Sequence, residues 1–339
     1  MADVSKWTEA ELEAAMSEPS DAARAALNGL SGDIAVLGAG GKMGPTLCMM
    51  LKQAAPTKTV YAVSRFTDER VARRLGDAGV TVVRGDLLDE DVYPDLPAAD
   101  TVYYLVGMKF GATGNQPLTW AMNAYIPALV ARRYAKSRIA ALSTGNVYPL
   151  MDASGAGASE QTEPDPIGEY AQSCLGRERI FEYFSEKNGT PVVLLRLNYA
   201  NEPRYGIIVD LTLKILSGQP IDLTMGAVNL IYQRDANDYI ARSVTAATSP
   251  ATVLNVTGPA RVEVRKLAKT IGRICKREVK FTGTEAPTAL LSDASMCHRL
   301  FGPPETTLEE MVQTITEWVT SGKRTLSKPT KYDVRTGKF

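Results

Sequence analysis

The sequence predicts an α/β protein with a doubly wound parallel sheet and a smaller α+β lobe toward the C-terminus. Short apolar runs alternate with helical patterns from residue 33 to about residue 200, and the links between them are short. Such alternation produces right-handed crossovers and therefore a parallel sheet. We expect the sheet domain at 33–200, after a helical arm at 1–32. The smaller lobe is expected at 201–321, where some segments can return to the sheet, and a loosely attached polar tail at 322–339.

The expected strands share apolar, often β-branched runs, and the expected helices share apolar residues at spacings of three and four. Strands are expected at 34–37, 60–63, 80–84, 100–107, 138–143 and 191–197. Helices are expected within 5–28 with a break near Pro19, from 44 to about 51, and at 67–75, 118–134 and 168–187. The smaller lobe is expected to contain helices near 207–215, from 236 and at 264–275, strands near 228–232 and 278–283, and two final helices.

Bulk composition excludes several classes of function. The 339 residues are 45% hydrophobic and 22% charged, as in a soluble globular protein, and Lys+Arg and Asp+Glu are both 38. Zero formal charge argues against a nucleic-acid surface, and no apolar run approaches the ~20 residues of a membrane span. The acidic N-terminus is unlike a secretory signal, so we expect a cytoplasmic protein without nucleic-acid or membrane partners. A single histidine, His298, and four dispersed cysteines make a metal site unexpected.

The stretch DIAVLGAGGKMGP places three glycines between an apolar run and a helical pattern. Gly38 would allow a tight turn, Gly41 a close approach of phosphates to the backbone, and Gly44 close packing of helix on strand. A strand, a glycine loop and a helix in this order hold a pyrophosphate at the helix N-terminus. We therefore expect this loop, with Lys42 and Met43, to bind a dinucleotide. The alternative is an ordinary strand-to-helix turn.

The end of the second expected strand bears on the choice of dinucleotide. In this architecture an acidic residue about 20 residues beyond the glycines hydrogen-bonds the adenosine ribose. That position is Ser64 here, and Arg65 follows it. A serine leaves room for a 2′-phosphate and a guanidinium matches its charge and shape, which favours NADP(H) over NAD(H). The alternative is that Arg65 is a solvated loop residue.

Further polar residues follow the later strands, and their order and spacing resemble the extended short-chain dehydrogenase/reductase family, the NAD(P)-dependent sugar epimerases and dehydratases. The resemblance covers roughly residues 33–320 and implies a Rossmann-type dinucleotide-binding domain. The resemblance implies an adenine-contacting turn at Asp86 and Leu87, the family's helix asparagine at Asn123 as a catalytic residue, the catalytic Ser/Thr at Thr144, and the catalytic, coenzyme-contacting tyrosine at Tyr170. The alternatives are an ordinary turn residue for Asp86, a plain strand-end hydroxyl for Thr144 and an ordinary aromatic at a helix start for Tyr170.

One departure from the family concerns its Tyr-x-x-x-Lys motif. The chain has Cys174 at the lysine position, and in the family that lysine holds the nicotinamide ribose and lowers the pKa of the tyrosine. A free tyrosine has a pKa of about 10 and is a poor base at neutral pH unless a positive charge stabilises the phenolate. Lys109, after the fourth strand, and Arg177, two turns beyond Tyr170, are candidate sources of that charge. We expect Cys174 to be an apolar filler rather than a nucleophile.

Two classes of function follow. The first is an epimerase, dehydratase or reductase that acts on a sugar, sugar acid or sugar nucleotide by hydride transfer, with Tyr170 as acid/base and Thr144 bonded to the same oxygen. The second is a non-catalytic relative that binds NAD(P) as a sensor or subunit, which the missing lysine favours. The complete glycine loop and the retained Tyr170 and Thr144 favour the enzyme. The resemblance also implies a homodimer through the helices that contain Asn123 and Tyr170.

Overall fold

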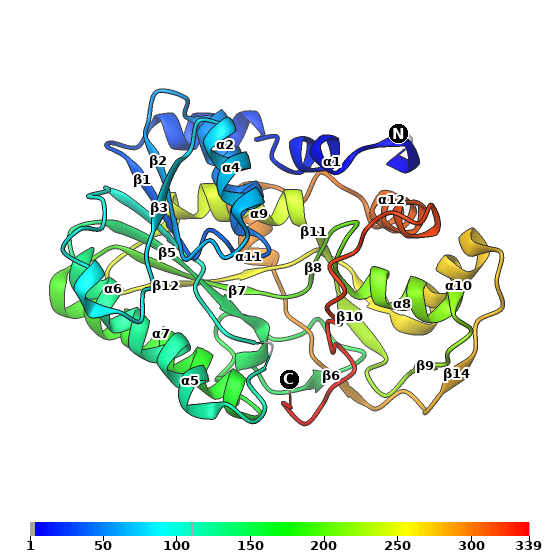
Figure 1. Cartoon of the computed structure of the whole chain (residues 1–339). Coiled ribbons are helices and arrows are strands. Elements are labelled where there is room, and N and C mark those ends of the chain that lie inside the picture. Colours follow the sequence, from blue (N-terminus) through cyan, green and yellow to red (C-terminus); the bar gives the residue numbers. More distant parts are fainter. Residues whose placement is uncertain (1–3, 110, 339) are drawn as a thin grey trace.

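The computed structural model describes residues 4–109 and 111–338, and a seven-stranded sheet lies at the centre of this part of the chain (Figure 1). Its strand order is β12-β7-β5-β4-β1-β2-β3, and every neighbouring pair is parallel. The sheet strands are β1 (Ile34–Leu37), β2 (Val60–Ser64), β3 (Thr81–Arg84), β4 (Thr101–Tyr104), β5 (Arg138–Thr144), β7 (Val192–Leu197) and β12 (Thr252–Val256). The direction of winding reverses between β1 and β4, which is where such sheets bind ligands. The predicted fold class is confirmed.

Helices cover both faces of this sheet. They are α2 (Asp21–Asn28), α3 (Gly44–Ala54), α4 (Glu69–Asp77), α6 (Ile126–Arg133), α7 (Glu169–Asn188), α9 (Gln233–Ser243) and α11 (Ser295–Phe301). In β1, Ile34 and Val36 pack in the cluster that contains α2, α3, α9 and α11, whereas Ala35 and Leu37 pack in the cluster that contains α6 and α7. Successive strand residues point to opposite faces, so a sheet covered on both faces needs a continuous apolar run.

One strand of the sheet meets a possibility that the sequence expectation left open, and one helix differs from that expectation. The strand β12 comes from within 201–321 and pairs with β7, so the smaller lobe does return a segment to the sheet. The single helix expected at 118–134 is instead α5 (Gln116–Trp120), a π-helical turn η3 (Ala121–Tyr125) and α6. Single π-turns are rare and often occur at functional sites. Residue 123 lies inside this turn.

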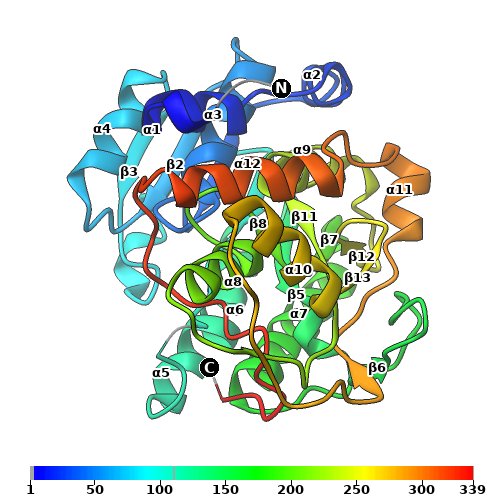
Figure 2. The ribbon, with the colours of Figure 1, turned by 90° about the vertical axis from the view of Figure 1, so that its right-hand side faces the viewer.

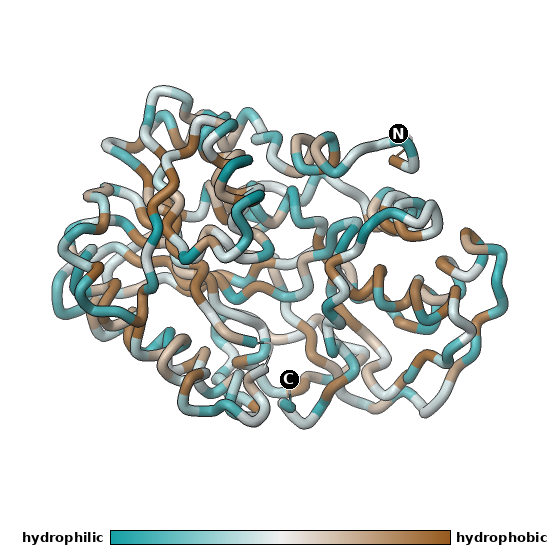
Figure 3. The backbone as a smooth tube through the Cα atoms, viewed as in Figure 1, coloured by the Kyte–Doolittle hydropathy of each residue, from teal (hydrophilic) through white to brown (hydrophobic). Residues whose placement is uncertain are grey.

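The smaller lobe lies beyond the carboxyl ends of the sheet strands (Figures 1 and 2). Its apolar core contains residues of three helices, and Figure 3 shows the hydrophobic residues of α8 as a brown stretch. The helices are α8 (Ile207–Leu216), α10 (Val264–Cys275) and α12 (Leu308–Thr320). Short strand pairs complete the lobe and its junction with the sheet domain: β10 (Ala227–Asn229) with β13 (Arg261–Glu263), β14 (Phe281–Thr282) with β9 (Ile221–Asp222), β15 (Thr288–Ala289) with β6 (Met151–Asp152), and β11 (Ile231–Tyr232) with β8 (Ala200–Asn201).

The N-terminal arm packs on both lobes. In α1 (Glu9–Met16), Leu12 and Met16 are fully buried in the core of the smaller lobe. In α2, Leu27 is fully buried in a core of the sheet domain. Between them, the buried Glu13 accepts hydrogen bonds from Arg74 of α4 and from Arg204 of the segment between β8 and α8. The arm therefore joins the two cores.

The C-terminal tail contradicts the expectation of loose attachment. Thr330 and Tyr332 are only 2% and 1% exposed, and the Leu326 backbone N–H donates to the Arg204 carbonyl at 2.8 Å. Figures 1 and 2 show the tail in red, running from α12 along α8 between the lobes. The expectation was wrong because polar composition predicts solvation only where side chains lack specific partners. Within the described residues, no helix combines the length and apolar character needed to cross a membrane.

Candidate functional site

The glycine loop after β1 is held by close backbone contacts. Gly38 has φ +85°, and a Cβ at this position would lie 2.9 Å from the Val106 backbone nitrogen. A Cβ at Gly44 would lie 2.3 Å from the Ala39 carbonyl oxygen. Both positions therefore exclude side chains, one by conformation and both by contact distance. The first turn of α3 consequently packs directly on the loop.

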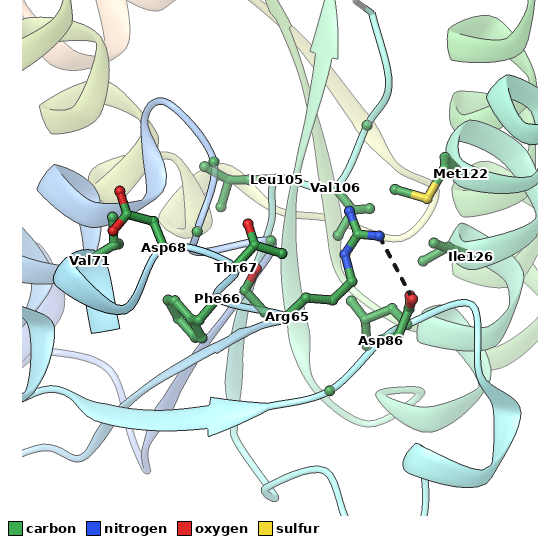
Figure 4. A pocket seen from close by; sticks show the side chains of 17 residues that line it. Arg65, Phe66, Thr67, Asp68, Val71, Asp86, Leu105, Val106, Met122 and Ile126 are labelled. Carbon is green, nitrogen blue, oxygen red and sulfur yellow. Dashed lines mark ion pairs between the residues drawn. The ribbon is translucent and has the colours of Figure 1, made fainter. Parts of the chain in front are cut away.

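A cavity of about 240 Å³ opens beside this loop, at the carboxyl ends of the parallel strands. We call it the glycine-loop cavity, and Figure 4 shows it from close by. A Cβ at Gly41 would meet only the Gly38 carbonyl, at 3.3 Å, and would otherwise occupy open cavity space. The loop is thus a cradle that a side chain would fill, which fits a diphosphate lying against backbone N–H groups. The predicted residues that line it are Gly38, Gly41, Ser64, Arg65, Asp86 and Leu87.

The charged side chains that line the glycine-loop cavity are those of Arg65, Asp68 and Asp86. The Arg65 guanidinium lies 3.8 Å from the Asp86 carboxylate, and these side chains are 60% and 44% exposed (Figure 4). An ion pair so exposed contributes about 0–1 kcal/mol, so little holds Arg65 to Asp86. The Ser64 Oγ lies 2.8 Å from the position of a Cβ on Gly40, so this serine packs against the glycine loop. Arg65 is therefore available to an anionic group in the cavity.

A second cavity, of about 190 Å³, lies between the sheet domain and the smaller lobe. We call it the Tyr170 cavity. Thr144 reaches it from the end of β5 and Tyr170 from the first turn of α7, so the two predicted catalytic side chains share one space. Lys42 and Met43 of the glycine loop also line it, which makes the two cavities neighbours along that loop. A ligand lying along the loop would therefore reach both.

The surroundings of Tyr170 keep its hydroxyl protonated. Burial raises the pKa of Tyr170 well above its usual range, and the neighbouring Cys174 thiol acts in the same direction. The positive charge of Arg177 and a hydrogen bond with the Thr144 side chain act in the opposite direction on this pKa. Thr144 is itself held by the Asn146 side chain, whose amide donates to Thr144 Oγ1 at 2.9 Å. The hydroxyl of Tyr170 is therefore suited to donate a proton.

The position of the missing lysine is apolar. Cys174 is 0% exposed, and burial raises the pKa of its thiol, so a nucleophilic thiolate is disfavoured here. A lysine from another element occupies the region instead. The Lys109 Nζ, in the loop after β4, lies 5.9 Å from the centre of the Tyr170 ring and donates to the Thr330 carbonyl at 3.3 Å. Burial lowers the pKa of Lys109 to about 8.

Arg177 is buried close to Tyr170 but is not one of the residues that line the Tyr170 cavity. Its guanidinium donates to the Leu142 carbonyl at 2.7 Å and to the Asn123 Oδ1 at 2.8 Å, and its residue is 5% exposed. These bonds tie α7 to the end of β5 and to the π-turn. Arg177 thus supplies a fixed positive charge near Tyr170 without facing the cavity.

Asn123, which we predict to be catalytic, is buried behind the walls of the two cavities. It is 0% exposed and lines neither cavity. Its Oδ1 accepts from the Met108 N–H, and its Nδ2 donates to the Met108 carbonyl and to the Ser173 hydroxyl. With these bonds and the one from Arg177, its amide is saturated by protein groups. Asn123 therefore fixes the loop after β4 against α7, and its catalytic role stays a prediction.

Two other predicted coenzyme residues differ from a simple lining role. The Lys42 Nζ donates to the Ala200 carbonyl at 2.8 Å and lies 4.5 Å from the centre of the Tyr205 ring, so this side chain points away from the glycine-loop cavity. Burial lowers the pKa of Lys42 to about 7. Gly44 lines neither cavity and acts through packing alone.

Sequence reasoning missed the side of the Tyr170 cavity that the smaller lobe and the tail supply. Tyr205 and Thr330 line it, from the segment before α8 and from the tail. No motif surrounds either residue. Asn198, just after β7, also lines it, and its place at the end of the Arg-Leu-Asn run that closes this strand was the available signal.

Comparisons with known proteins agree with this arrangement. The model of the NAD dependent epimerase/dehydratase family matches residues 34–256. No curated protein matches the chain. UDP-glucuronic acid 4-epimerase from Bacillus cereus in complex with NAD is 17% identical, with 86% of this chain and 100% of that chain covered and a TM-score of 0.72. dTDP-glucose 4,6-dehydratase from Bacillus anthracis in complex with NAD is 15% identical, with 85% of this chain and 96% of that chain covered and a TM-score of 0.72. UDP-glucose 4-epimerase from Thermotoga maritima with UDP-glucose is 17% identical, with 86% of this chain and 99% of that chain covered and a TM-score of 0.71. At these identities the solved structures show a shared fold.

Proposed function

Because the chain belongs to the NAD dependent epimerase/dehydratase family, we propose that it is an NAD(P)-dependent enzyme that transfers hydride at a carbon of a sugar, sugar acid or sugar nucleotide. The observation that supports this most directly is the placement of Tyr170 and Thr144 in one cavity that adjoins the glycine-loop cavity. Two of the three structural neighbours named above are complexes with NAD, which supports a nicotinamide dinucleotide along the loop.

In this proposal Tyr170 and Thr144 act on one substrate oxygen. When bound, the nicotinamide supplies or accepts the hydride at the carbon that bears this oxygen. Tyr170 gives a proton to the oxygen during reduction and takes it back during oxidation, while the Thr144 hydroxyl hydrogen-bonds the same oxygen and orients it. The raised pKa of Tyr170 makes proton donation the easier direction. Each pKa unit by which Tyr170 exceeds the ambient pH costs about 1.4 kcal/mol when it must act as the base.

Two cations lower this cost in our proposal. The buried Arg177 guanidinium supplies a fixed positive charge near Tyr170, and the Lys109 ammonium supplies another 5.9 Å from the centre of the Tyr170 ring. Lys109 lies on a different element from the lysine of the family motif, yet it reaches the same tyrosine. Tyr170 therefore still has a positive charge beside it, although Cys174 stands in place of that lysine.

We also propose that NADP(H) is favoured over NAD(H). Ser64 ends β2 in place of a carboxylate, and the exposed Arg65 that follows it also lines the glycine-loop cavity. A guanidinium beside a serine fits a 2′-phosphate, whereas a carboxylate there would repel it. The loose ion pair with Asp86 can open at little cost.

The principal experiment compares Tyr170→Phe with the unaltered chain. We expect kcat to fall by about 10²–10⁴-fold, because general acid–base catalysis is lost, while coenzyme affinity changes little. Turnover is followed by nicotinamide absorbance with a panel of free sugars, sugar acids and sugar nucleotides. The matched control is Tyr183→Phe on the same helix, where the side chain is 56% exposed.

The second candidate function is a non-catalytic NAD(P)-binding subunit or sensor, and the observation that favours it is the apolar thiol of Cys174 at the lysine position. Tight coenzyme binding without turnover of any panel member by the unaltered chain would support that function. In either case we propose a homodimer through α5, η3 and α7, because the residues Leu118, Trp120 and Tyr125 of α5 and η3 are 37–45% exposed. Light scattering on the purified protein measures this directly.

A further inference from the structure

The C-terminal segment, residues 323–338, is bonded to the smaller lobe and lies between the two lobes (Figures 1 and 2). The Thr330 backbone N–H and hydroxyl both donate to one oxygen of the Asp210 carboxylate in α8, at 2.8 and 2.6 Å. Burial raises the pKa of Asp210, and these two bonds act in the opposite direction. The Arg335 guanidinium donates to the Thr288 carbonyl and hydroxyl, both at 2.6 Å. The segment is therefore held in one place on the smaller lobe.

One residue of this segment contacts the lysine beside the proposed catalytic tyrosine. The Lys109 ammonium donates to the Thr330 carbonyl at 3.3 Å and lies 5.9 Å from the centre of the Tyr170 ring. Thr330, Lys109 and Tyr170 all line the Tyr170 cavity. Asp210 thus fixes the N–H and hydroxyl of Thr330, and the carbonyl of the same residue receives Lys109. A chain of hydrogen bonds therefore runs from α8 through the segment to the lysine.

The same segment also contacts the start of the helix that contains Tyr170. A Cβ on Gly168 would lie 2.7 Å from the Gly337 carbonyl oxygen, and a Cβ on Gly337 would lie 2.1 Å from the Ile167 carbonyl oxygen. The two backbones are therefore in direct contact. Gly168 precedes α7 by one residue and Tyr170 by two. The segment thus contacts both Lys109 and the start of the helix of Tyr170.

The charges near Lys109 indicate how the segment affects this lysine. Burial lowers the pKa of Lys109 to about 8, the positive charge of Lys331 acts in the same direction, and the Asp210 carboxylate acts in the opposite direction. A thiolate at Cys174 would also raise this pKa, but burial raises the pKa of the thiol, so it is neutral where Lys109 titrates. The Tyr170 hydroxyl is neutral there as well, because burial raises its pKa. Of these groups, Asp210 therefore supplies the negative charge that favours the ammonium form of Lys109.

We propose that Asp210 and Thr330 are positioning residues for the hydride-transfer site, because together they hold the Lys109 ammonium beside Tyr170. A lysine at position 174 would be held one turn from Tyr170 by α7 itself, whereas Lys109 lies in a loop and needs a partner from outside it. The C-terminal segment supplies that partner. This inference rests on the proposed function, because it concerns the same tyrosine, and it extends the site to a segment that no motif marks.

The first experiment measures the titration of Lys109 without any substrate. Trace acetylation of the full chain over a series of pH values, followed by peptide mass spectrometry, gives the pKa of this amine. Asp210→Asn keeps an oxygen that can accept both Thr330 bonds but removes the negative charge, so we expect the pKa of Lys109 to fall. Lys331→Gln removes the positive charge of the segment, so we expect the pKa of Lys109 to rise.

The matched control is Asp222→Asn, also in the smaller lobe. The Thr224 N–H and hydroxyl donate to one oxygen of Asp222 at 2.7 and 2.6 Å, so this pair has the same hydrogen bonds as Asp210 and Thr330. Neither Asp222 nor Thr224 lines the Tyr170 cavity. Asp222→Asn should therefore leave the pKa of Lys109 unchanged.

The second experiment separates the position of Lys109 from its charge. Asp210→Ala removes the acceptor that fixes Thr330, so we expect kcat for substrate oxidation to fall by about 10–100-fold at every pH, with little change in KM. Asp210→Asn keeps the position, so its rate should equal that of the unaltered chain at pH values well below the pKa of Lys109 and fall behind as the pH rises. Circular dichroism reports whether each variant is folded.

Two results would overturn the proposal: an unchanged pKa of Lys109 in Asp210→Asn, or an unaltered kcat in a folded Asp210→Ala protein. If Asp210→Ala does not fold, the titration of Asp210→Asn decides alone. The expected pKa shifts in a chain that oxidises no sugar of the panel would refute the proposed function and still support the holding of Lys109 by the segment.

Discussion

The charge on Lys109 allows one prediction to be worked out from the structure. Its Nζ lies 5.9 Å from the centre of the Tyr170 ring. At an effective dielectric constant of about 20, a unit charge about 6 Å from a phenolate oxygen stabilises the phenolate by about 2.8 kcal/mol. This equals about two pKa units, or roughly 100-fold in available base. We therefore expect Lys109→Met to lower kcat for substrate oxidation by up to about 100-fold near neutral pH, and to lower the reductive rate less.

The pKa of Lys109 determines how the effect of Lys109→Met on the rate depends on pH. Burial lowers the pKa of Lys109 to about 8, so its charge is present below that pH and is lost as the pH rises through it. The rate difference between Lys109→Met and the unaltered chain should therefore be largest below pH 8 and shrink above it. Lys109→Arg should restore most of the rate, because it restores the charge.

The matched control is Lys187→Met, which removes an exposed lysine 5.4 Å from the Tyr183 ring on the same helix as Tyr170. It should leave the kinetics unchanged. A Lys109→Met enzyme with an unaltered oxidative rate and pH profile would refute the argument. A loss of rate that Lys109→Arg fails to restore would point to the bond with the Thr330 carbonyl instead of the charge.

Three further predictions concern the coenzyme cavity and the fold. Gly38→Ala should destabilise the protein by about 1–3 kcal/mol in thermal unfolding and weaken coenzyme binding, because its φ of +85° and the 2.9 Å distance from the Val106 nitrogen exclude a Cβ. The control Gly76→Ala, which has open space around the new Cβ, should leave the stability unchanged or raise it. Arg65→Ala should weaken NADPH binding with little effect on NADH in fluorescence titration, and an equal effect on both would contradict the 2′-phosphate assignment. Glu178→Gln should lower the free energy of unfolding by about 3–5 kcal/mol, measured with denaturant, because it leaves the buried Arg196 guanidinium, 2.7 Å away, without its counter-ion. The control Glu182→Gln, in the more exposed pair with Arg179, should lower it by under about 1 kcal/mol.

Local patterns in the sequence were sufficient for most of the sheet domain. Continuous apolar runs predicted the strands because both faces of the sheet are covered. The glycine spacing predicted the loop because Gly38 and Gly44 meet backbone atoms that allow no side chain. The strand β12 was not assigned, since its run Thr252–Val256 contains an asparagine that a strand-only pattern disfavours.

The walls of the Tyr170 cavity were harder to predict because they depend on contacts between distant segments. Thr330 and Asp210 are 120 residues apart, and Lys109 and Thr330 are 221 apart. No local periodicity marks such pairs. The sequence placed Lys109 only in a loop after a strand, and the contact with Tyr170 depends on how that loop is held by Asn123. The interrupted helix at 121–125 likewise has no compositional signal.

The buried carboxylate of the N-terminal arm limits how this molecule can open. Glu13 bonds Arg74 of the sheet domain with one oxygen and Arg204 beside the smaller lobe with the other. A hinge motion between the lobes would have to break the bond of Glu13 to Arg74 or its bond to Arg204, and Arg204 would keep Glu202 as a counter-ion. Any opening between the lobes should therefore detach one side of the N-terminal arm or carry the arm along with one lobe.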